Sequence, residues 1–181
     1  MRLSLLGIQG SGKTTQAKLL SNVLGIPHLS IGQLLRTFAE GDTAEAKQVK
    51  EAIDAGQLLS DEFTIRFVKQ HLTGPDYANG FVIDGFPRTV GQAREFLDSL
   101  DYLIHIELDE KEALWRLAGR VEDRDDTSLS AVYERIKLFK EVTTPVIEVF
   151  RVANKLIQID GTSSIESIHA SILKALGATS A

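Results

Sequence analysis

Short apolar segments alternate along the chain with longer segments in which apolar residues recur every three or four positions. The short segments are rich in Val, Ile and Leu, which is typical of strands that are buried on both faces. They predict strands at residues 2–6, 27–30, 81–84, 102–108 and 155–160. The longer segments predict helices near residues 13–24, 31–40, 44–55, 61–72, 89–99, 110–120, 128–152 and 164–176.

Strands that alternate with helices are typical of a parallel sheet with helices on both faces. We therefore predict a doubly wound α/β fold with a five-stranded parallel sheet. The chain contains no repeat, low-complexity tract or linker, so residues 1–181 are expected to form a single domain. Ligands bind such sheets beyond the carboxyl ends of the strands, so residues that carry chemistry should directly follow the strands.

Two of the predicted helices begin with polar residues spaced as in a capping box. Asp109 precedes Glu112 by three positions, and Ser163 precedes Glu166 by the same interval. In this arrangement the first side chain accepts a hydrogen bond from a free N–H group of the first helical turn. We therefore predict Asp109 and Ser163 as the N-terminal caps of these helices.

Composition excludes several classes of protein. The chain has 181 residues, of which 43% are hydrophobic and 25% charged, as in ordinary globular domains. The net charge of −5 argues against a nucleic-acid or anionic-membrane surface, and no apolar stretch has the length of a membrane span. Because the first predicted strand begins at residue 2, we expect no signal peptide and a cytoplasmic protein.

The content of cysteine and histidine restricts the metal chemistry. The chain has no cysteine, which excludes disulfides and a thiolate zinc site. The four histidines lack the spacing of metal ligands and are interpreted as structural or surface residues. We therefore expect no zinc.

Residues 7–16, GIQGSGKTTQ, lie between the first predicted strand and the first predicted helix. Their glycines and the Lys13-Thr14 pair match the pattern G-x-x-x-x-G-K-[ST] at every fixed position. The glycines let backbone N–H groups turn toward phosphate oxygens, and the following helix adds its N-terminal dipole. The lysine can reach the outer phosphates, and the threonine hydroxyl lies where a magnesium ligand is usual. We interpret this segment as a nucleotide phosphate loop rather than a plain strand-to-helix turn.

A second candidate segment is GFVIDGFPRTVGQ at residues 80–92. Asp84 ends the predicted strand, so its carboxylate reaches the sheet edge beside the phosphate loop and can hold magnesium through water. Gly85 permits close approach of a ligand, and Arg88 offers two parallel hydrogen bonds to a phosphate. Taken alone, this segment also fits a plain turn with a surface arginine.

Further segments decide between these interpretations. GSGKTTQA and GFPRT, with a glutamine three residues later, are accompanied in order by SIGQLLR at 30–36, DAGQLLSDE at 54–62, RLAGR at 116–120 and RDD at 124–126. Together they resemble the nucleoside monophosphate kinases, and the adenylate kinases most closely. The resemblance extends from Arg2 to about Thr162, and this combination of motifs is very specific.

The resemblance implies a P-loop NTPase fold with the strand order 2-3-1-4-5. It also implies a small helical insertion at about residues 31–60 that binds the acceptor monophosphate. The expected reaction is reversible transfer of the ATP γ-phosphoryl group to AMP, which gives two ADP. We expect magnesium with ATP as the cofactor and a monomer whose partners are ATP and AMP. No general base is required, because a phosphate oxygen is the nucleophile.

The resemblance also assigns residues to the two substrates. For ATP they are Gly10, Ser11, Gly12, Lys13, Thr14, Thr15, Arg116 and Arg120. For AMP they are Ile31, Arg36, Leu58, Leu59, Gly85, Arg88, Gln92, Arg124 and Arg135. Those expected to act in transfer are Lys13, Asp84, Arg88, Arg120, Arg124 and Arg135. Positioned cations suit this chemistry, because negative charge spreads over the equatorial oxygens in the transition state. The Gln92 amide has both a donor and an acceptor, which suits the edge of adenine.

Two residues depart from the family pattern in the segment that resembles STGD. Ile31 replaces a threonine that contacts the acceptor base, and Gln33 replaces an aspartate near the metal and the acceptor. The first change removes a hydrogen-bond partner, and the second removes a negative charge. Both leave the identity of the accepted base open.

The lid is the third departure. Only residues 121–123 separate Arg120 from Arg124, where family members insert a lid loop or a lid domain. A lid excludes water and completes the cationic cage. We therefore predict a minimal lid at about residues 120–126, with more solvent at the donor site and some wasteful ATP hydrolysis.

Three alternatives follow from these departures. A kinase of UMP, CMP or another monophosphate is suggested by Ile31. A nucleotide-binding regulatory protein with weak transfer activity is suggested by Gln33 and the short lid. A kinase of a metabolite such as shikimate is the third, and the GFPRT pattern with Gln92 argues against it.

Overall fold

The computed structural model of the chain describes residues 1–118 and 129–178. Its centre is a five-stranded parallel sheet in the order β2-β3-β1-β4-β5, which confirms the predicted topology. The strands are β1 (Arg2–Leu6), β2 (His28–Ser30), β3 (Phe81–Asp84), β4 (Tyr102–Glu107) and β5 (Leu156–Asp160). Each lies within about one residue of the segment predicted from its apolar run.

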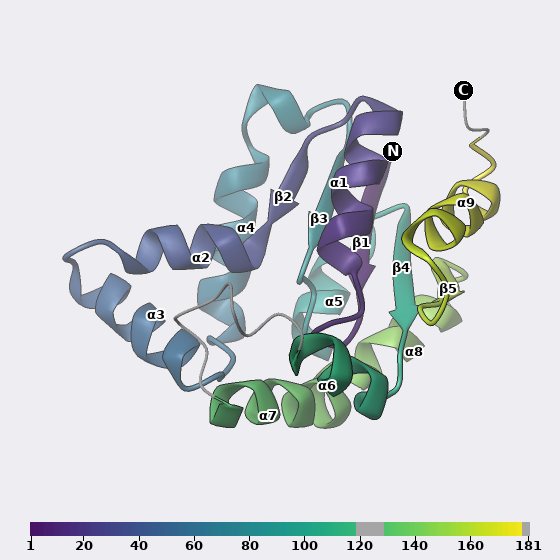
Figure 1. Cartoon of the computed structure of the whole chain (residues 1–181). Coiled ribbons are helices and arrows are strands. Elements are labelled where there is room, and N and C mark those ends of the chain that lie inside the picture. The colour runs from purple at the N-terminus through teal and green to yellow at the C-terminus, as the bar shows by residue number, and fades with distance from the viewer. Residues whose placement is uncertain (119–128, 179–181) are drawn as a thin grey trace.

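Helices cover both faces of this sheet (Figure 1). Helices α1 (Lys13–Leu24) and α9 (Ile165–Ala175) cover one face. Helices α4 (Asp61–Leu72), α5 (Val90–Phe96) and α8 (Thr144–Val152) cover the other. The arrangement is the doubly wound α/β fold of P-loop NTPases.

Burial on both faces of the sheet explains why the strand sequences are continuous apolar runs. Leu20 of α1 and Ile172 of α9 belong to the apolar core on one face of the sheet. On the other face, Phe96 of α5 and Phe150 of α8 belong to a second core, in which Phe96 meets Phe86 edge to face at 4.7 Å between ring centroids. Because both faces are covered, all of β3 and residues 3–6 of β1 are buried, whereas β5 at the sheet edge is partly exposed.

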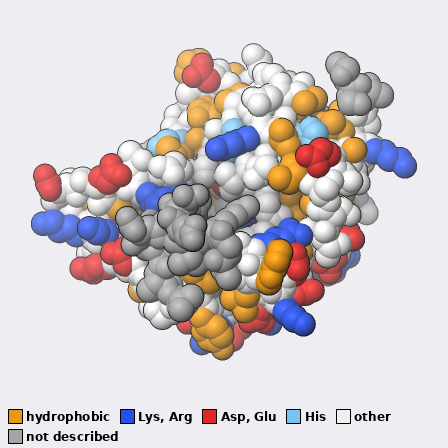
Figure 2. Space-filling view, in the orientation of Figure 1, with side chains coloured by type: hydrophobic (Ala, Val, Ile, Leu, Met, Phe, Trp, Pro, Cys, Tyr) orange, Lys and Arg blue, Asp and Glu red, His pale blue; other side chains and the backbone are white. Residues whose placement is uncertain are grey.

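Two helices lie away from the sheet and form an arm, defined here as residues 31–60. The arm contains α2 (Ile31–Ala39) and α3 (Ala44–Asp54), and it projects beside the carboxyl ends of the strands (Figure 1). Its outer surface carries basic and acidic side chains together, at the left of Figure 2. Below the sheet edge in Figure 1 lie α6 (Glu110–Ala118) and α7 (Leu129–Leu138).

The helix predicted at residues 128–152 is interrupted. Between α7 and α8 the chain forms a π-helical turn, η3 (Phe139–Thr143). Pro145 has no N–H group to donate to the Glu141 carbonyl four residues earlier. The N–H group of Thr144 donates to the Phe139 carbonyl five residues earlier, and the Thr144 hydroxyl donates to the same carbonyl at 3.1 Å. The missing N–H group of the proline interrupts the α-helical hydrogen bonds, and the chain forms a π-helical turn at this point. A short 3₁₀ helix, η1 (Pro75–Tyr77), precedes β3.

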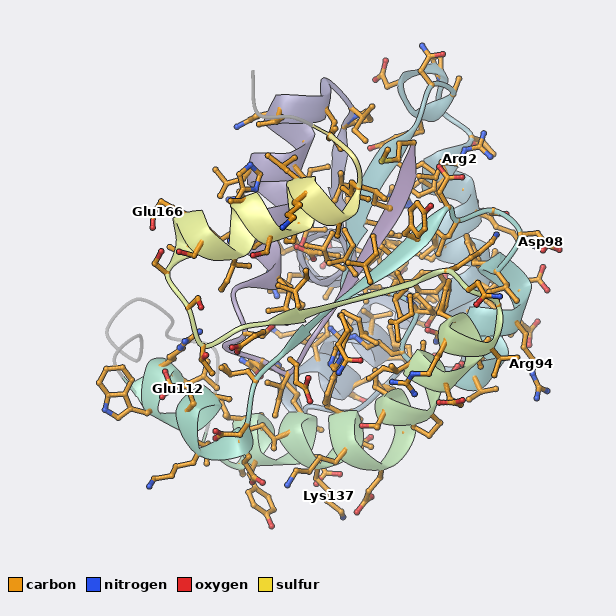
Figure 3. All side chains as sticks on the ribbon, turned by 90° about the vertical axis from the view of Figure 1, so that its right-hand side faces the viewer. Arg2, Arg94, Asp98, Glu112, Lys137 and Glu166 are labelled. Atoms are coloured by element: carbon orange, nitrogen blue, oxygen red, sulfur yellow. The ribbon has the colours of Figure 1, made fainter. Side chains whose placement is uncertain are left out.

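One predicted cap is correct and the other is displaced by one residue. Asp109 accepts a hydrogen bond from the Glu112 N–H group at 2.9 Å, as predicted. The prediction of Ser163 is wrong, because Ser164 caps α9 and accepts from the Ser167 N–H group at 3.2 Å. Glu166, labelled at the start of α9 in Figure 3, therefore lies one position too early for a capping box.

None of the helices in the described ranges is long and apolar enough to cross a membrane.

Candidate functional site

The carboxyl ends of β1, β2 and β3 border a cavity of about 620 Å³, a size typical of small-molecule sites. Its walls come from the β1–α1 turn, the β2–α2 segment, residues 56–59, the β3–α5 turn, and α7 with η3. Elements far apart in the sequence therefore meet at one sheet edge. This is the edge at which parallel α/β sheets bind ligands.

The β1–α1 turn has the tight backbone that a phosphate loop requires. Gly10 and Gly12 have φ angles of +92° and +85°, a region that favours glycine. At Gly7 a Cβ atom would lie 2.4 Å from Ser11 Oγ. Helix α1 begins directly after Gly12, and no described side chain caps its first turn. Its leading N–H groups and dipole therefore provide a site for an anion.

Lys13, the first residue of α1, lines the cavity. Its Nζ donates to the Ile8 carbonyl at 3.4 Å, across the phosphate loop. A hydrogen bond of this length is weak. Thr15 lies in the first turn of α1 outside the cavity lining, whereas Thr14 is part of the lining.

Asp84 is held as a buried anion beside this loop. It is 3% exposed, with His28 Nε2 at 3.1 Å from Oδ2 and the Ser30 hydroxyl donating to Oδ1 at 3.0 Å. Burial alone raises the pKa of Asp84, but hydrogen bonds from His28, Thr14 and Ser30 outweigh it, so the pKa is lowered. The carboxylate is therefore ionised at neutral pH.

These residues fit magnesium that arrives with a nucleotide. Within residues 1–118 and 129–178, no group of three or more His, Cys, Asp or Glu side chains could hold a metal ion. One ionised carboxylate beside a hydroxyl suits Mg²⁺, which keeps several waters and takes its other ligands from substrate phosphates. Asp84 provides this carboxylate, and Thr14, which hydrogen-bonds to it at the start of α1, provides a hydroxyl beside the phosphate loop.

Three arginines from separate elements converge on the cavity. Arg36 comes from α2, Arg88 from the β3–α5 turn and Arg135 from α7. Arg88 Nε donates to the Gly85 carbonyl at 2.8 Å, and Arg135 Nη2 donates to the Ile53 carbonyl at 2.9 Å. Figure 1 shows that α2 and α7 approach this edge from different sides.

Like charges make this cluster receptive to an anion. Desolvation lowers the pKa of Arg88. The charges of Arg135 and Arg36 lower this pKa further, whereas the charge of Asp84 raises it. A guanidinium remains charged despite such a shift. A bound phosphate therefore relieves the mutual repulsion of the three arginines and gains charge-assisted hydrogen bonds.

The structure brings the predicted base-binding residues together at the cavity. Ile31, Leu58, Leu59 and Gln92 all line it, and Gln92 is only 2% exposed. Gln92 Oε1 accepts from the Arg88 backbone N–H group at 2.8 Å. Its Nε2 donates to Asp61 Oδ1 at 2.9 Å. One N–H group and one lone pair of the amide are not used by these two hydrogen bonds.

The predicted donor-side residues are only partly described. Arg116 does not line the cavity, and its Nε donates at 2.8 Å to Glu112, which is labelled on α6 in Figure 3. Arg116 Nη2 also reaches the Thr162 carbonyl at 3.5 Å. Arg120, Arg124 and the minimal lid predicted at 120–126 lie outside the described residues.

Three side-chain contacts of the site were missed by sequence reasoning. His28 and Ser30 both bind Asp84, and Asp61 binds Gln92. The parallel alignment of β2 with β3, which pairs Ser30 with Asp84, could have indicated the contact of Ser30. Asp61 gave no such signal, because acidic residues are common in the first turn of any helix, where they interact favourably with the helix dipole.

Comparisons with known proteins identify the family of the chain. A family model described as adenylate kinase matches residues 5–155. An adenylate kinase from Stenotrophomonas maltophilia is 36% identical over 187 residues, which cover 98% of this chain and 100% of the relative. One from Corynebacterium urealyticum is 39% identical and covers 97% and 99% of the two chains. One from Agrobacterium fabrum is 34% identical over 100% of both. The chain therefore belongs to the adenylate kinase family, whose reaction is phosphoryl transfer between ATP and AMP.

Proposed function

We propose that the chain transfers the γ-phosphoryl group of ATP reversibly to AMP, with the AMP phosphate held between Arg36 and Arg88. The observation that carries this assignment is the convergence of Arg36, Arg88 and Arg135 on the cavity that Lys13 also lines. Lys18 also lines this cavity, so the described part of the chain gives it five lysine and arginine side chains with the buried carboxylate of Asp84. This combination suits two phosphorylated substrates and a divalent cation.

The phosphate loop and the arginines have different tasks in this proposal. The loop N–H groups and Lys13 bind the ATP phosphates, and Thr14 and Asp84 would hold Mg²⁺ through water. The cation, when bound, neutralises charge on the donor phosphates. Arg88 and Arg135 border both substrates and stabilise the migrating phosphoryl group more than the ground state. By the family resemblance, we assign Arg120 and Arg124 to the cationic cage and Arg116 to the donor adenine.

We assign the selection of the acceptor base to the arm and to α5. Leu58, Leu59 and Ile31 provide an apolar surface, and the Gln92 amide hydrogen-bonds the adenine edge. The arm serves as the acceptor-binding insertion and residues 120–126 as a minimal lid. We further propose that the protein is cytoplasmic and, as the family resemblance implies, a monomer.

A pyrimidine monophosphate is the alternative acceptor. Ile31 is 3% exposed and lines the cavity, where a side chain without a hydrogen-bonding group cannot select between bases by polar contact. Apolar contact and size alone discriminate weakly between ligands of similar shape. This observation favours a broader range of acceptors than AMP alone.

Formation of ADP from ATP and magnesium tests the proposal, with AMP, GMP, CMP, UMP or no acceptor present in parallel. We expect rapid ADP formation with AMP. A faster reaction with CMP or UMP would move the assignment to the alternative. Equal ADP formation without acceptor would mean that water reaches the transferred group, and ATP binding without turnover would indicate a regulatory protein.

A further inference from the structure

We propose that Asp61 is a positioning residue that sets the orientation of the Gln92 amide and so determines which base the acceptor site prefers. Asp61 is the first residue of α4 and is not among the residues that line the cavity. It acts through Gln92, so this inference rests on the proposed contact between Gln92 and the acceptor base.

The hydrogen bonds around Gln92 define a single orientation of its amide. Asp61 Oδ1 accepts from Gln92 Nε2 at 2.9 Å and from the Thr89 hydroxyl at 2.7 Å. On the other side, Gln92 Oε1 accepts from the Arg88 N–H group at 2.8 Å. A flipped amide would place Oε1 against the Asp61 carboxylate and Nε2 against the Arg88 N–H group. Both contacts would then be repulsive, so the carboxylate holds the amide in one orientation.

Asp61 and α5 approach each other closely. At Gly91 a Cβ atom would lie 2.3 Å from Asp61 Oδ2, so α5 reaches this carboxylate because residue 91 is glycine. Thr89 caps α5 by accepting from the Gln92 N–H group at 3.1 Å, while its hydroxyl donates to Asp61. The carboxylate therefore holds both the start of α5 and the side chain that faces the cavity.

Asp61 also connects the apolar residues proposed to contact the base with the Gln92 amide. It follows Leu58 and Leu59, which line the cavity, and Ser60, whose hydroxyl caps α4 by accepting from the Phe63 N–H group at 3.3 Å. The apolar contacts and the amide are thus fixed to each other through one carboxylate. Purine and pyrimidine edges present donors and acceptors at different positions, so a mobile amide would select less sharply between them.

Kinetics with two acceptors test this inference. In Asp61→Ala we expect the ratio of kcat/KM for AMP to kcat/KM for CMP to fall about 10- to 100-fold, the loss typical of a hydrogen bond to a charged group. The KM for ATP should stay unchanged. Both terms of the ratio scale with the amount of folded protein, so partial unfolding cancels.

Two further variants separate positioning from general damage. Asp61→Asn retains an acceptor oxygen at the same place and should restore most of the ratio. Glu62→Ala removes an exposed acidic residue from the same first turn of α4 and should leave the ratio unchanged. An equal fall in Asp61→Ala and Glu62→Ala would overturn the inference, because the effect would then belong to the helix.

A double-mutant cycle with Gln92→Ala identifies the route of the effect. If Asp61 acts through Gln92, adding Asp61→Ala to Gln92→Ala changes the ratio no further. A full additional loss would overturn the inference and leave the function of Gln92 intact. If Gln92→Ala itself leaves the ratio unchanged, the proposed base contact fails and the inference with it.

Discussion

Arg88 has the hydrogen-bonding groups and the surroundings that suit a phosphate ligand. Its Nε donates to the Gly85 carbonyl. Desolvation and the charges of Arg135 and Arg36 lower its pKa, and the charge of Asp84 raises it. Gly85 has a φ of +77°, and a Cβ atom there would lie 3.2 Å from Arg88 Nη2. Glycine at this position therefore gives the guanidinium room beside the sheet edge.

Replacing Arg88 should impair acceptor binding and transfer. We expect Arg88→Ala to lower kcat/KM for AMP roughly a hundredfold, about 3 kcal/mol, because a charge-assisted contact is lost. Arg88→Lys keeps the charge without the fork and should recover only part of this loss. Steady-state kinetics with varied AMP measure the effect. Unchanged kinetics in Arg88→Ala would remove Arg88 from the acceptor site.

Ile31 should govern how strictly AMP is preferred. We expect Ile31→Thr to raise the ratio of kcat/KM for AMP to kcat/KM for UMP, because the new hydroxyl offers a partner to the base. The variant buries a hydroxyl in place of apolar atoms and should lose about 1–2 kcal/mol of stability. Kinetics with both acceptors measure the ratio, and an unchanged ratio would show that Ile31 does not set base preference.

At the scale of elements, the arm lies against α7. Arg135 of α7 donates to the Ile53 carbonyl at the end of α3. A Cβ atom at Gly56 would lie 2.6 Å from the Ala131 carbonyl oxygen, so the two backbones nearly touch. The α7 helix thus borders the acceptor side of the cavity directly.

Gly56→Ala tests this contact, with Gly25→Ala as a matched control. Both glycines have positive φ, +72° and +63°, so each alanine should cost about 1–2 kcal/mol of stability. Only Gly56 has a backbone neighbour, since nothing lies within 4 Å of a Cβ atom at Gly25. We expect the KM for AMP to rise in Gly56→Ala alone. A similar KM in both variants would show that the contact between arm and α7 is dispensable.

At the scale of the whole molecule, the covered sheet also buries an ionisable group. His105 in β4 is 7% exposed, and its Nδ1 has no hydrogen-bond partner in the described structure. Desolvation lowers the pKa of His105, with opposing contributions from Glu107, which raises it, and Arg151, which lowers it. The ring stacks on Phe139 at 6.3 Å between centroids, so its neutral form belongs to the core.

This burial should make the protein sensitive to mild acid. The unfolded chain binds a proton at His105 near the ordinary pKa of 6.5, whereas the folded chain does so only at lower pH. The contribution of the neutral ring to the free energy of unfolding is therefore fully present above pH 6.5. It is lost as the pH falls toward the pKa of His105 in the folded protein. We expect His105→Leu to reduce the loss of stability between pH 7 and pH 5. Urea unfolding at several pH values measures it, and parallel curves for both proteins would contradict the prediction.

The sequence predicted most of the fold because its signals are local. Apolar runs marked the strands, helical periodicity marked the helices, and Asp109 could be recognised as a cap from its spacing to Glu112. The prediction was wrong where the outcome depended on a competition between neighbours. Ser163 and Ser164 are equivalent as capping residues, and the effect of Pro145 on the helix before it depends on how that helix packs.

For the site, the sequence by itself indicated the groups that line the cavity: the phosphate loop through its glycine spacing, Lys13 and Asp84, and, through the resemblance, Arg36, Arg88 and Arg135. A backbone that curls around phosphates requires glycine at fixed positions, so a phosphate loop can be recognised from a short stretch of sequence. Only the tertiary structure decided which side chains meet across the sheet edge. The hydrogen bonds of Asp61 to Gln92, of His28 to Asp84 and of Arg135 to the Ile53 carbonyl join residues 31, 56 and 82 positions apart. Such contacts arise from the packing of whole elements, because chain folding rather than sequence spacing sets the distance between those side chains.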